Sequence, residues 1–84
     1  MSIRILYFAA LREALGQSEE SFDLPAEAIS LGQLRQTLAA RDGNWQTLNT
    51  MKNLKAAINQ TMAGAEVLLQ DGDEVAFFPP VTGG

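Results

Sequence analysis

Apolar residues recur at every second position at the start of the chain and predict a strand over residues 2–8 (SIRILYF). The residues that share its first face are Ile3, Ile5 and Tyr7. Leu6 and Phe8 make the opposite face apolar too, because successive side chains of a strand point to opposite sides. A strand that is apolar on both faces is typical of the centre of a sheet.

Two shorter elements follow this strand. Residues 9–16 (AALREALG) predict a short helix, which Gly16 can end in the left-handed conformation. Residues 21–24 predict a second strand, and Pro25 ends it or places it at an edge, because proline has no backbone N–H to donate.

The main helix is predicted by a capping pattern at residues 30–33 (SLGQ). The Ser30 side chain can accept a hydrogen bond from the backbone N–H of Gln33, while the Gln33 side chain reaches back to Ser30. The core-facing stripe that follows consists of Leu31, Leu34 and Leu38. We expect Gly43 to end this helix.

The second half of the chain alternates turns and short strands. Residues 44–53 predict a short helical turn anchored by Trp45 and Leu48. Asp71-Gly72 predicts a turn, because both residues tolerate positive φ. The predicted strands cover residues 54–60 (LKAAINQ), 65–69 and 74–78 (EVAFF).

This order of elements predicts an α+β fold with a mixed four- to five-stranded sheet. One main helix can cover only one face of such a sheet. Two strands, a helix and two or three further strands form the plan of a β-grasp domain, with the first and last strands side by side and parallel. We expect residues 1–78 to form this domain and residues 79–84 to form an extended tail.

The face of the sheet without the helix is a candidate partner surface. Val75 and Phe77 point to one side of the last strand, and Ala76 and Phe78 point to the other. One phenylalanine must therefore lie on the open face, close to the tail. The alternative is that loops or the short first helix cover it.

Composition excludes several kinds of chemistry. The 84-residue chain has no cysteine and no histidine, which excludes disulfides and Cys-His or Ser-His-Asp triads and disfavours a zinc site. Ten acidic and six basic residues give a net charge of −4, which argues against nucleic-acid binding and favours a partner with a basic docking surface. No apolar run is long enough to span a membrane, and the N-terminus lacks the layout of a signal peptide, so we expect a cytoplasmic location.

The last eight residues, FFPPVTGG, form a tail suited to present a carboxylate. Pro79 and Pro80 cannot donate backbone hydrogen bonds, so the ladder of the last strand must stop and the chain leaves as a stiff spacer. Residues 81–84 can reach about 13 Å further. Gly83 and Gly84 have no side chain and fit a channel as wide as a backbone, in which the Gly84 carboxylate is bound or activated. A frayed terminus is the simpler alternative.

Three segments resemble the small, sulfur-carrying subunit of molybdopterin synthase. They are ILYFAALREALG at residues 5–16, AAINQT at 56–61 and QDGDEVAFFPPVTGG at 70–84. The resemblance spans the whole chain, with its strongest part in the last 30 residues. It implies a ubiquitin-like β-grasp fold and a sulfur carrier that acts within a two-subunit enzyme and is no enzyme alone.

The resemblance also implies roles for individual residues. An adenylyltransferase resembling ubiquitin-activating enzymes uses ATP to activate Gly84, a sulfur donor protein converts it to a thiocarboxylate, and Gly83 gives access to the partner's channel. The sulfur then passes to cyclic pyranopterin monophosphate in the large subunit of a heterotetramer. The expected partner-interface residues are Phe78, Met62, Pro79, Pro80, Val81 and Thr82. The chain itself is expected to bind no cofactor, metal, nucleic acid or membrane.

Other interpretations remain at this stage. Arg12 can pair with a partner carboxylate or lie on a solvated helix face, and Asp71 and Asp73 are better explained by turn chemistry than by a carboxylate site. Phe78 and Met62 can also pack in the core. The competing functions are a sulfur carrier for thiamine biosynthesis, a ubiquitin-like protein modifier and a plain binding module.

Overall fold

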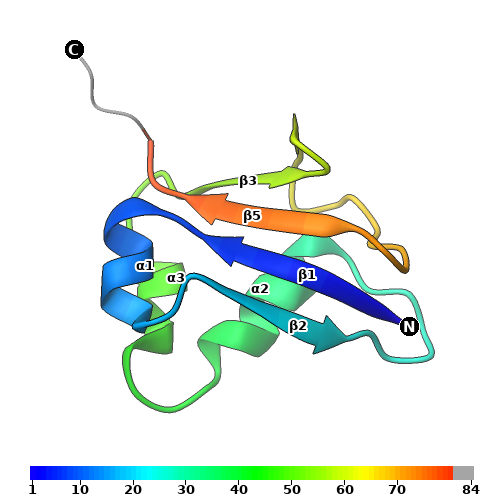
Figure 1. Ribbon diagram of the computed structural model, residues 1–84, viewed down its shortest axis with the longest axis horizontal. Coiled ribbons are helices and arrows are strands. Elements are labelled where there is room, and N and C mark those ends of the chain that lie inside the picture. The colour runs from blue at the N-terminus through cyan, green and yellow to red at the C-terminus, as the bar shows by residue number, and fades with distance from the viewer. Residues whose placement is uncertain (81–84) are drawn as a thin grey trace.

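A computed structural model of the protein describes residues 1–80, and these form a five-stranded sheet with helices on one side (Figure 1). The strands are β1 (Ser2–Tyr7), β2 (Glu19–Asp23), β3 (Lys55–Ile58), β4 (Thr61–Met62) and β5 (Glu74–Phe78). The helices are α1 (Ala9–Leu15), α2 (Leu31–Ala39), the 3₁₀ turn η1 (Asn44–Gln46) and α3 (Thr47–Thr50). No helix in this part of the chain is long and apolar enough to cross a membrane.

The strand order is β2-β1-β5-β3-β4, so the first and last strands lie inside the sheet. β1 and β5 are parallel, with Tyr7 opposite Phe77, and the other three pairings are antiparallel. The predicted central position of both strands is therefore confirmed. Only one face of each strand contributes to the core, through Ile3, Ile5, Tyr7, Val75 and Phe77.

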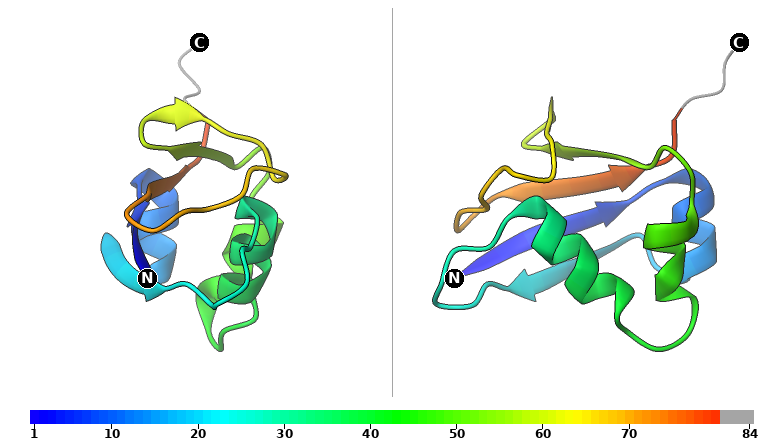
Figure 2. Two further views of the ribbon diagram at one scale, coloured as in Figure 1. Left: turned by 90° about the vertical axis from the view of Figure 1, so that its right-hand side faces the viewer. Right: turned by 180° about the vertical axis from the view of Figure 1, so that it is seen from behind.

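The core lies between the sheet and the helices behind it (Figure 2). β1 contributes Ile3, Ile5 and Tyr7, as their alternation predicts, and β5 contributes Val75 and Phe77. The helical residues buried against them are Leu11 of α1, Leu31, Leu34, Leu38 and Ala39 of α2, and Leu48 of α3.

Local capping explains where α1 and α2 begin and end. The predicted capping box is present, with the Ser30 hydroxyl accepting from the Gln33 N–H at 3.1 Å and the Gln33 side chain accepting from the Ser30 N–H at 2.8 Å. Gly16 ends α1 with φ of 76°, as expected. The prediction that Gly43 ends α2 is wrong. The helix ends at Ala39, and Gly43 instead precedes η1 with φ of 84°.

The prediction of a strand over residues 65–69 is also wrong. Only one isolated bridge forms there, between Ser30 and Leu68, and the short strand β4 lies earlier in the chain. The segment is instead held against the start of α2, where the Gly32 N–H donates to the Ala65 carbonyl at 2.9 Å. A Cβ on Gly32 would lie 3.1 Å from the Ala65 Cβ, so glycine permits this close approach.

The INQT stretch forms the hairpin between β3 and β4. Ile58 pairs with Thr61, and the two residues between them, Asn59 and Gln60, both have positive φ, as a tight two-residue hairpin turn requires. The Asn59 side-chain oxygen accepts from the Glu74 N–H at 3.0 Å, which ties the turn to the start of β5. This motif is therefore structural, and it fixes where the following residue, Met62, lies.

Candidate functional site

β5 carries the chain to the candidate site, at the end of the sheet where the tail begins. Phe77 pairs with Tyr7 of β1 and Ala56 of β3, and Phe78 pairs with Lys55. The Phe8 N–H donates to the Phe77 carbonyl at 3.2 Å. The ladder stops after Phe78, because the next two residues are prolines and have no N–H, and the chain turns away from the sheet there (Figure 1).

The two phenylalanines of β5 have different environments. Phe77 is 1% exposed and stacks on Tyr7 in the core, with 6.3 Å between ring centroids. Phe78 is half-buried and lies on the opposite face, which carries no helix (Figures 1 and 2). The prediction of a phenylalanine on the open face is thus confirmed. The alternative that the first helix covers this face is wrong. α1 contacts the core side through Leu11.

Apolar side chains surround Phe78 on this face. We call them the open-face patch: Leu6, Phe8, Ala57, Met62, Ala76 and Phe78. The pairings of Leu6 with Ala76, Ala76 with Ala57 and Ala57 with Met62 place these residues side by side across four strands. Met62 is 61% exposed and Phe8 is 43% exposed, so an apolar surface remains in contact with solvent.

Neither Met62 nor Phe78, the two apolar residues predicted at the interface, belongs to the core. Met62 is too exposed to be a core residue, and Phe78 lies outside the core cluster. Phe8 belongs to the same patch but was not predicted as a site residue. The sequence could have indicated Phe8, because it lies on the second apolar face of the first strand and the core uses only the other face.

The charged side chains of the open face are few. Arg4 forms an ion pair with Glu19 of β2, with its Nε 2.8 Å from Oε2, and the hydrogen bond to Glu19, followed by the charge of Glu19, raises the pKa of Arg4. Glu74 lies beside Arg4 at the end of the sheet away from the tail, and Lys55 lies beside Phe78 at the tail end. Arg12 is exposed on α1 and forms no ion pair within residues 1–80.

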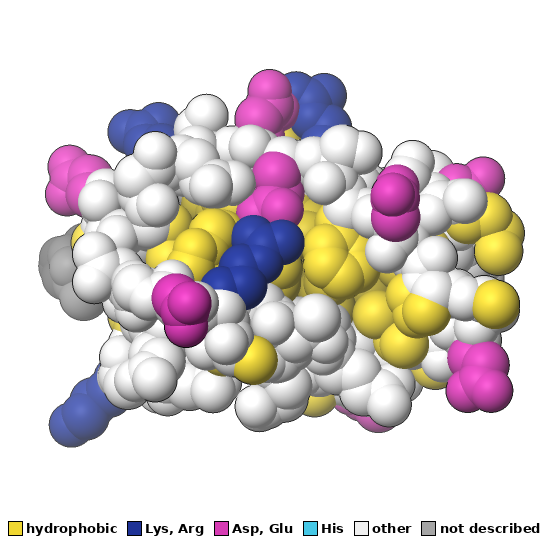
Figure 3. Space-filling model, turned by 90° about the horizontal axis from the view of Figure 1, so that it is seen from below, with side chains coloured by type: hydrophobic (Ala, Val, Ile, Leu, Met, Phe, Trp, Pro, Cys, Tyr) yellow, Lys and Arg dark blue, Asp and Glu magenta, His cyan; other side chains and the backbone are white. Residues whose placement is uncertain are grey.

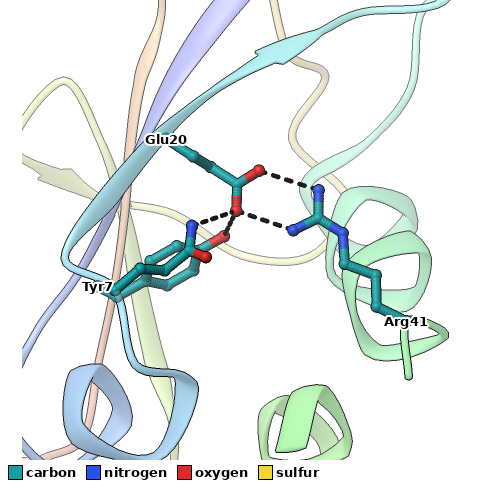
Figure 4. Close-up of polar contacts among 4 residues, drawn as sticks. Tyr7, Glu20 and Arg41 are labelled. Carbon is teal, nitrogen blue, oxygen red and sulfur yellow. Dashed lines mark hydrogen bonds and ion pairs between the residues drawn. The ribbon is translucent and has the colours of Figure 1, made fainter. Parts of the chain in front are cut away.

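A second polar cluster closes the edge of the sheet formed by β2 (Figure 4). The Glu20 carboxylate accepts hydrogen bonds from Tyr7 Oη at 2.8 Å, Gln17 Nε2 at 3.0 Å and both Nη atoms of Arg41 at 2.9 Å. Arg41 also lies over the Trp45 ring, 4.4 Å from its centroid. The view of the molecule from below shows acidic and basic side chains in contact, with apolar side chains exposed on either side of them (Figure 3).

The contacts of this cluster indicate a structural role. Burial alone would raise the pKa of Glu20, but the hydrogen bonds from Arg41 and Tyr7 and the charge of Arg41 outweigh burial and lower it. Burial, with Glu20 as hydrogen-bond acceptor, raises the pKa of Tyr7 far above its usual value. Both groups therefore keep one charge state near neutral pH, so the cluster joins β1, β2 and the residues after α2 and is unsuited to proton transfer.

The acidic residues around Gly72 are also structural. Asp71 Oδ1 accepts from the Ser2 N–H at 2.8 Å, and Asp73 accepts from the Gln70 N–H at 2.8 Å and from Asn59 Nδ2 at 3.0 Å. Gly72 has φ of 88°. The interpretation of these carboxylates as turn residues is confirmed, and residues 1–80 hold no group of three or more potential metal ligands.

The predicted reactive end lies outside the described residues. This applies to Val81, Thr82, Gly83 and Gly84, so the structure describes the open face of the sheet and the chain through Pro79 and Pro80. Within that part, Lys55 pairs with Phe78 at the end of β5, and Phe78 is surrounded by the apolar residues of the open-face patch.

The sheet order, the parallel pairing of the terminal strands and the main helix across one face define a ubiquitin-like β-grasp protein. Solved structures agree with this class. SAMP1 from Haloferax volcanii matches with a TM-score of 0.79 at 23% identity, each chain covered in full. A complex of subunits 1 and 2 of the molybdopterin-converting factor from Helicobacter pylori contains a chain that matches with a TM-score of 0.69 at 21% identity, again with both chains fully covered.

Sequence comparison identifies the family: the chain belongs to the ThiS family, whose profile matches residues 5–84. Among curated relatives, the molybdopterin synthase sulfur carrier subunit of Escherichia coli is 43% identical, with 98% of this chain and 99% of that protein covered. The protein of the same name from Haemophilus influenzae is 41% identical over the same shares. Small archaeal modifier protein 3 of Haloferax volcanii is 33% identical, and both chains are covered in full.

Proposed function

We propose that this chain is the cytoplasmic sulfur carrier subunit of a molybdopterin synthase. The observation that carries the proposal is the full-length relationship, at 43% identity, to a protein with that name. The exposed open-face patch at the root of FFPPVTGG supports it, because a carrier must dock on a larger subunit while its tail enters the active site. Residues 1–78 are the docking domain and residues 79–84 the reactive tail.

The chemistry is proposed to take place on the Gly84 carboxylate. An adenylyltransferase partner binds ATP, a carboxylate oxygen attacks the α-phosphate, and pyrophosphate leaves. Sulfide (HS⁻) released by a sulfur donor protein then attacks the carbonyl carbon of the acyl adenylate, AMP leaves with the C–O bond electrons, and a thiocarboxylate remains. Because a thiocarboxylate is a softer and better nucleophile than a carboxylate, it can transfer sulfur without a histidine or cysteine from this chain.

The large subunit is the proposed acceptor partner. It supplies the active site in which cyclic pyranopterin monophosphate receives the sulfur, and two carriers with a central dimer of large subunits form a heterotetramer. Phe8, Met62 and Phe78 are proposed to contact this subunit. Pro79 and Pro80 direct the chain away from the sheet, Val81 and Thr82 provide reach, and Gly83 and Gly84 enter the channel. The solved complex of subunits 1 and 2 of the molybdopterin-converting factor from Helicobacter pylori supports such an assembly.

The proposal is tested by the mass of the purified protein and by tail variants. We expect intact-mass analysis to find a species in which one oxygen is replaced by sulfur when the protein is incubated with an adenylyltransferase, ATP and a sulfur donor. Deleting Gly84, or adding one residue after it, should leave the circular dichroism spectrum and Tm unchanged and abolish sulfur transfer to cyclic pyranopterin monophosphate. Transfer retained by either variant contradicts the tail mechanism.

A protein modifier is the second candidate, favoured by the 33% identity to small archaeal modifier protein 3. Both functions begin with adenylation of Gly84, but a modifier ends as an isopeptide on lysines of other proteins. Conjugates of higher mass that disappear when Gly84 is deleted would favour the modifier. A sulfur carrier for thiamine biosynthesis would also form the thiocarboxylate, and it is distinguished by failure to supply sulfur to the pyranopterin.

A further inference from the structure

Lys55 occupies a position on the open face that sets it apart from the other basic residues. Of the six lysines and arginines, Arg4 and Arg41 form ion pairs with Glu19 and Glu20. The other four, Arg12, Arg35, Lys52 and Lys55, form none within residues 1–80, and of these four Lys55 is the one that lies in a strand of the sheet. It pairs directly with Phe78, the last residue of β5 before the tail.

The side chain of Lys55 shares the face of the open-face patch. Leu54, Ala56 and Ile58 pack against the core, so the alternation of β3 places Lys55 and Ala57 on the opposite side. Directly paired residues of an antiparallel ladder have Cβ atoms about 5 Å apart. The side chain of Lys55 therefore begins beside Phe78, at the border of the open-face patch.

Lys55 forms no ion pair with any carboxylate side chain of residues 1–80. A groove of about 430 Å³ lies between α2 and β3. Its charged lining residues are Lys55 and Arg35, and no aspartate or glutamate of residues 1–80 lines it. Arg35 donates through Nε to the Leu48 carbonyl at 2.8 Å. On the open face, Glu74 lies at the opposite end of β5, four residues before Phe78. The described part of the chain thus provides Lys55 with no counter-ion.

Docking would change the energetics of this charge. A partner that covers Phe78 and Met62 removes water from the residue paired with Phe78, and a desolvated ammonium group without a partner is costly. A protein that docks on this face tightly must therefore supply an oppositely charged group at this point. We propose that Lys55 sets the docking position of the tail by pairing with a carboxylate of the large subunit, at the entrance of the channel that receives Gly84.

This inference rests on the proposed function, and it refines the expectation drawn from net charge. The chain as a whole, at −4, favours a basic partner surface, but the root of the tail carries a cation and requires an acidic group opposite it. An apolar patch alone allows a partner to slide or rotate. One charge pair beside Phe78 would fix the register, so that the residues after Pro80 align with the channel.

The test compares variants that change charge equally at two places. Lys55→Gln removes the cation beside Phe78, and Gln36→Glu lowers the net charge by the same amount on the exposed side of α2, across the molecule from the open face. Binding of each variant to the large subunit of the same organism's synthase is measured by calorimetry at low and high salt. We expect Lys55→Gln to weaken binding about 10- to 100-fold and to reduce its salt dependence, Lys55→Glu to weaken it more, and Gln36→Glu to change it less than about twofold.

Each outcome decides between the inference and its alternatives. Equal binding by Lys55→Gln and the wild type overturns the role of Lys55 and leaves the proposed function intact. Tighter binding by Lys55→Gln also overturns it, since the lysine would then only add a desolvation cost. Failure of the wild type to bind any large subunit overturns the proposed function and this inference together. Because Lys55 is exposed, neither Lys55 variant should change the Tm.

Discussion

Replacing Glu20 by glutamine should destabilise the protein by an amount that depends on pH. The substitution keeps the size and one acceptor oxygen of the side chain but removes the charge that pairs with Arg41. The carboxylate accepts four hydrogen bonds, from Tyr7, Gln17 and the two Nη atoms of Arg41. The side chain of Glu20 is 17% exposed and that of Arg41 is 36% exposed, so solvent screens the pair only in part.

The magnitude follows from this geometry. A hydrogen bond to a charged group contributes about 1.5–3 kcal/mol when buried, and an exposed ion pair contributes about 0.2–1 kcal/mol. The glutamine can still accept one hydrogen bond from Tyr7 or Arg41, so we expect a loss of about 1.5 kcal/mol at pH 7. For a domain of this size that corresponds to a decrease in Tm of about 6–12 °C.

The pH dependence supplies the sharper test. The folded-state pKa of Glu20 is lowered below its value in the unfolded chain, which is about 4.3 for a free glutamate. The unfolded state therefore binds the proton more readily, and the stabilisation by Glu20 is present above that pH and lost as the pH falls through the folded pKa. The Tm difference between wild type and Glu20→Gln should be largest above about pH 4.5 and should decrease progressively as the pH falls below it.

Thermal unfolding followed by circular dichroism at pH 7, 5, 4 and 3 measures this difference. Glu19→Gln is the matched control, because Glu19 pairs with Arg4 on the exposed face and its loss should change stability by less than about 0.5 kcal/mol. A Tm difference for Glu20→Gln that stays the same from pH 7 to pH 3 would refute the argument, as would equal effects of the two substitutions.

Three further outcomes follow from the packing and the caps. Phe77→Ala should cost about 3–5 kcal/mol in chemical denaturation, because the ring is 1% exposed in the core, whereas Phe78→Ala should cost less than about 1.5 kcal/mol. Phe78→Ala and Met62→Ser should nevertheless weaken binding to the large subunit in calorimetry, and unchanged affinity of both would argue against docking through the open-face patch. Ser30→Ala should lower the Tm by about 4–8 °C through loss of about 1 kcal/mol from the capping box, and Thr37→Ala, on the exposed side of the same helix, serves as the comparison.

The elements that the sequence predicts correctly are those with a local signal. The capping box at Ser30, the left-handed end of α1 at Gly16 and the turn around Gly72 are set by neighbouring residues, and all three are present. The central position of β1 and β5 could also be predicted, because apolar residues on both faces are unfavourable at an exposed edge. The same second apolar face indicated the candidate site on the open side of the sheet.

The errors occur where distant residues decide the structure. Val67 and Leu69 alternate as in a strand, but Val67 and Leu68 are exposed, and the backbone of this segment bonds to the start of α2 instead of to a strand. The sequence predicts that α2 ends at Gly43, but the helix ends at Ala39. Arg41, which follows the helix, hydrogen-bonds to Glu20, a residue 21 positions earlier in the chain. Such pairings have no periodic pattern, and β4, with two residues, is too short to produce one.

The position of β5 also has a consequence for how the protein is made. β5 inserts between β1 and β3, although it is the last strand in the sequence. Because β5 is synthesised after the other four strands, the centre of the sheet stays vacant until β5 emerges from the ribosome, and its pairing with β1 spans almost the whole described chain. A nascent chain that stops before β5 leaves β1 and β3 without the strand that joins them and cannot complete the sheet.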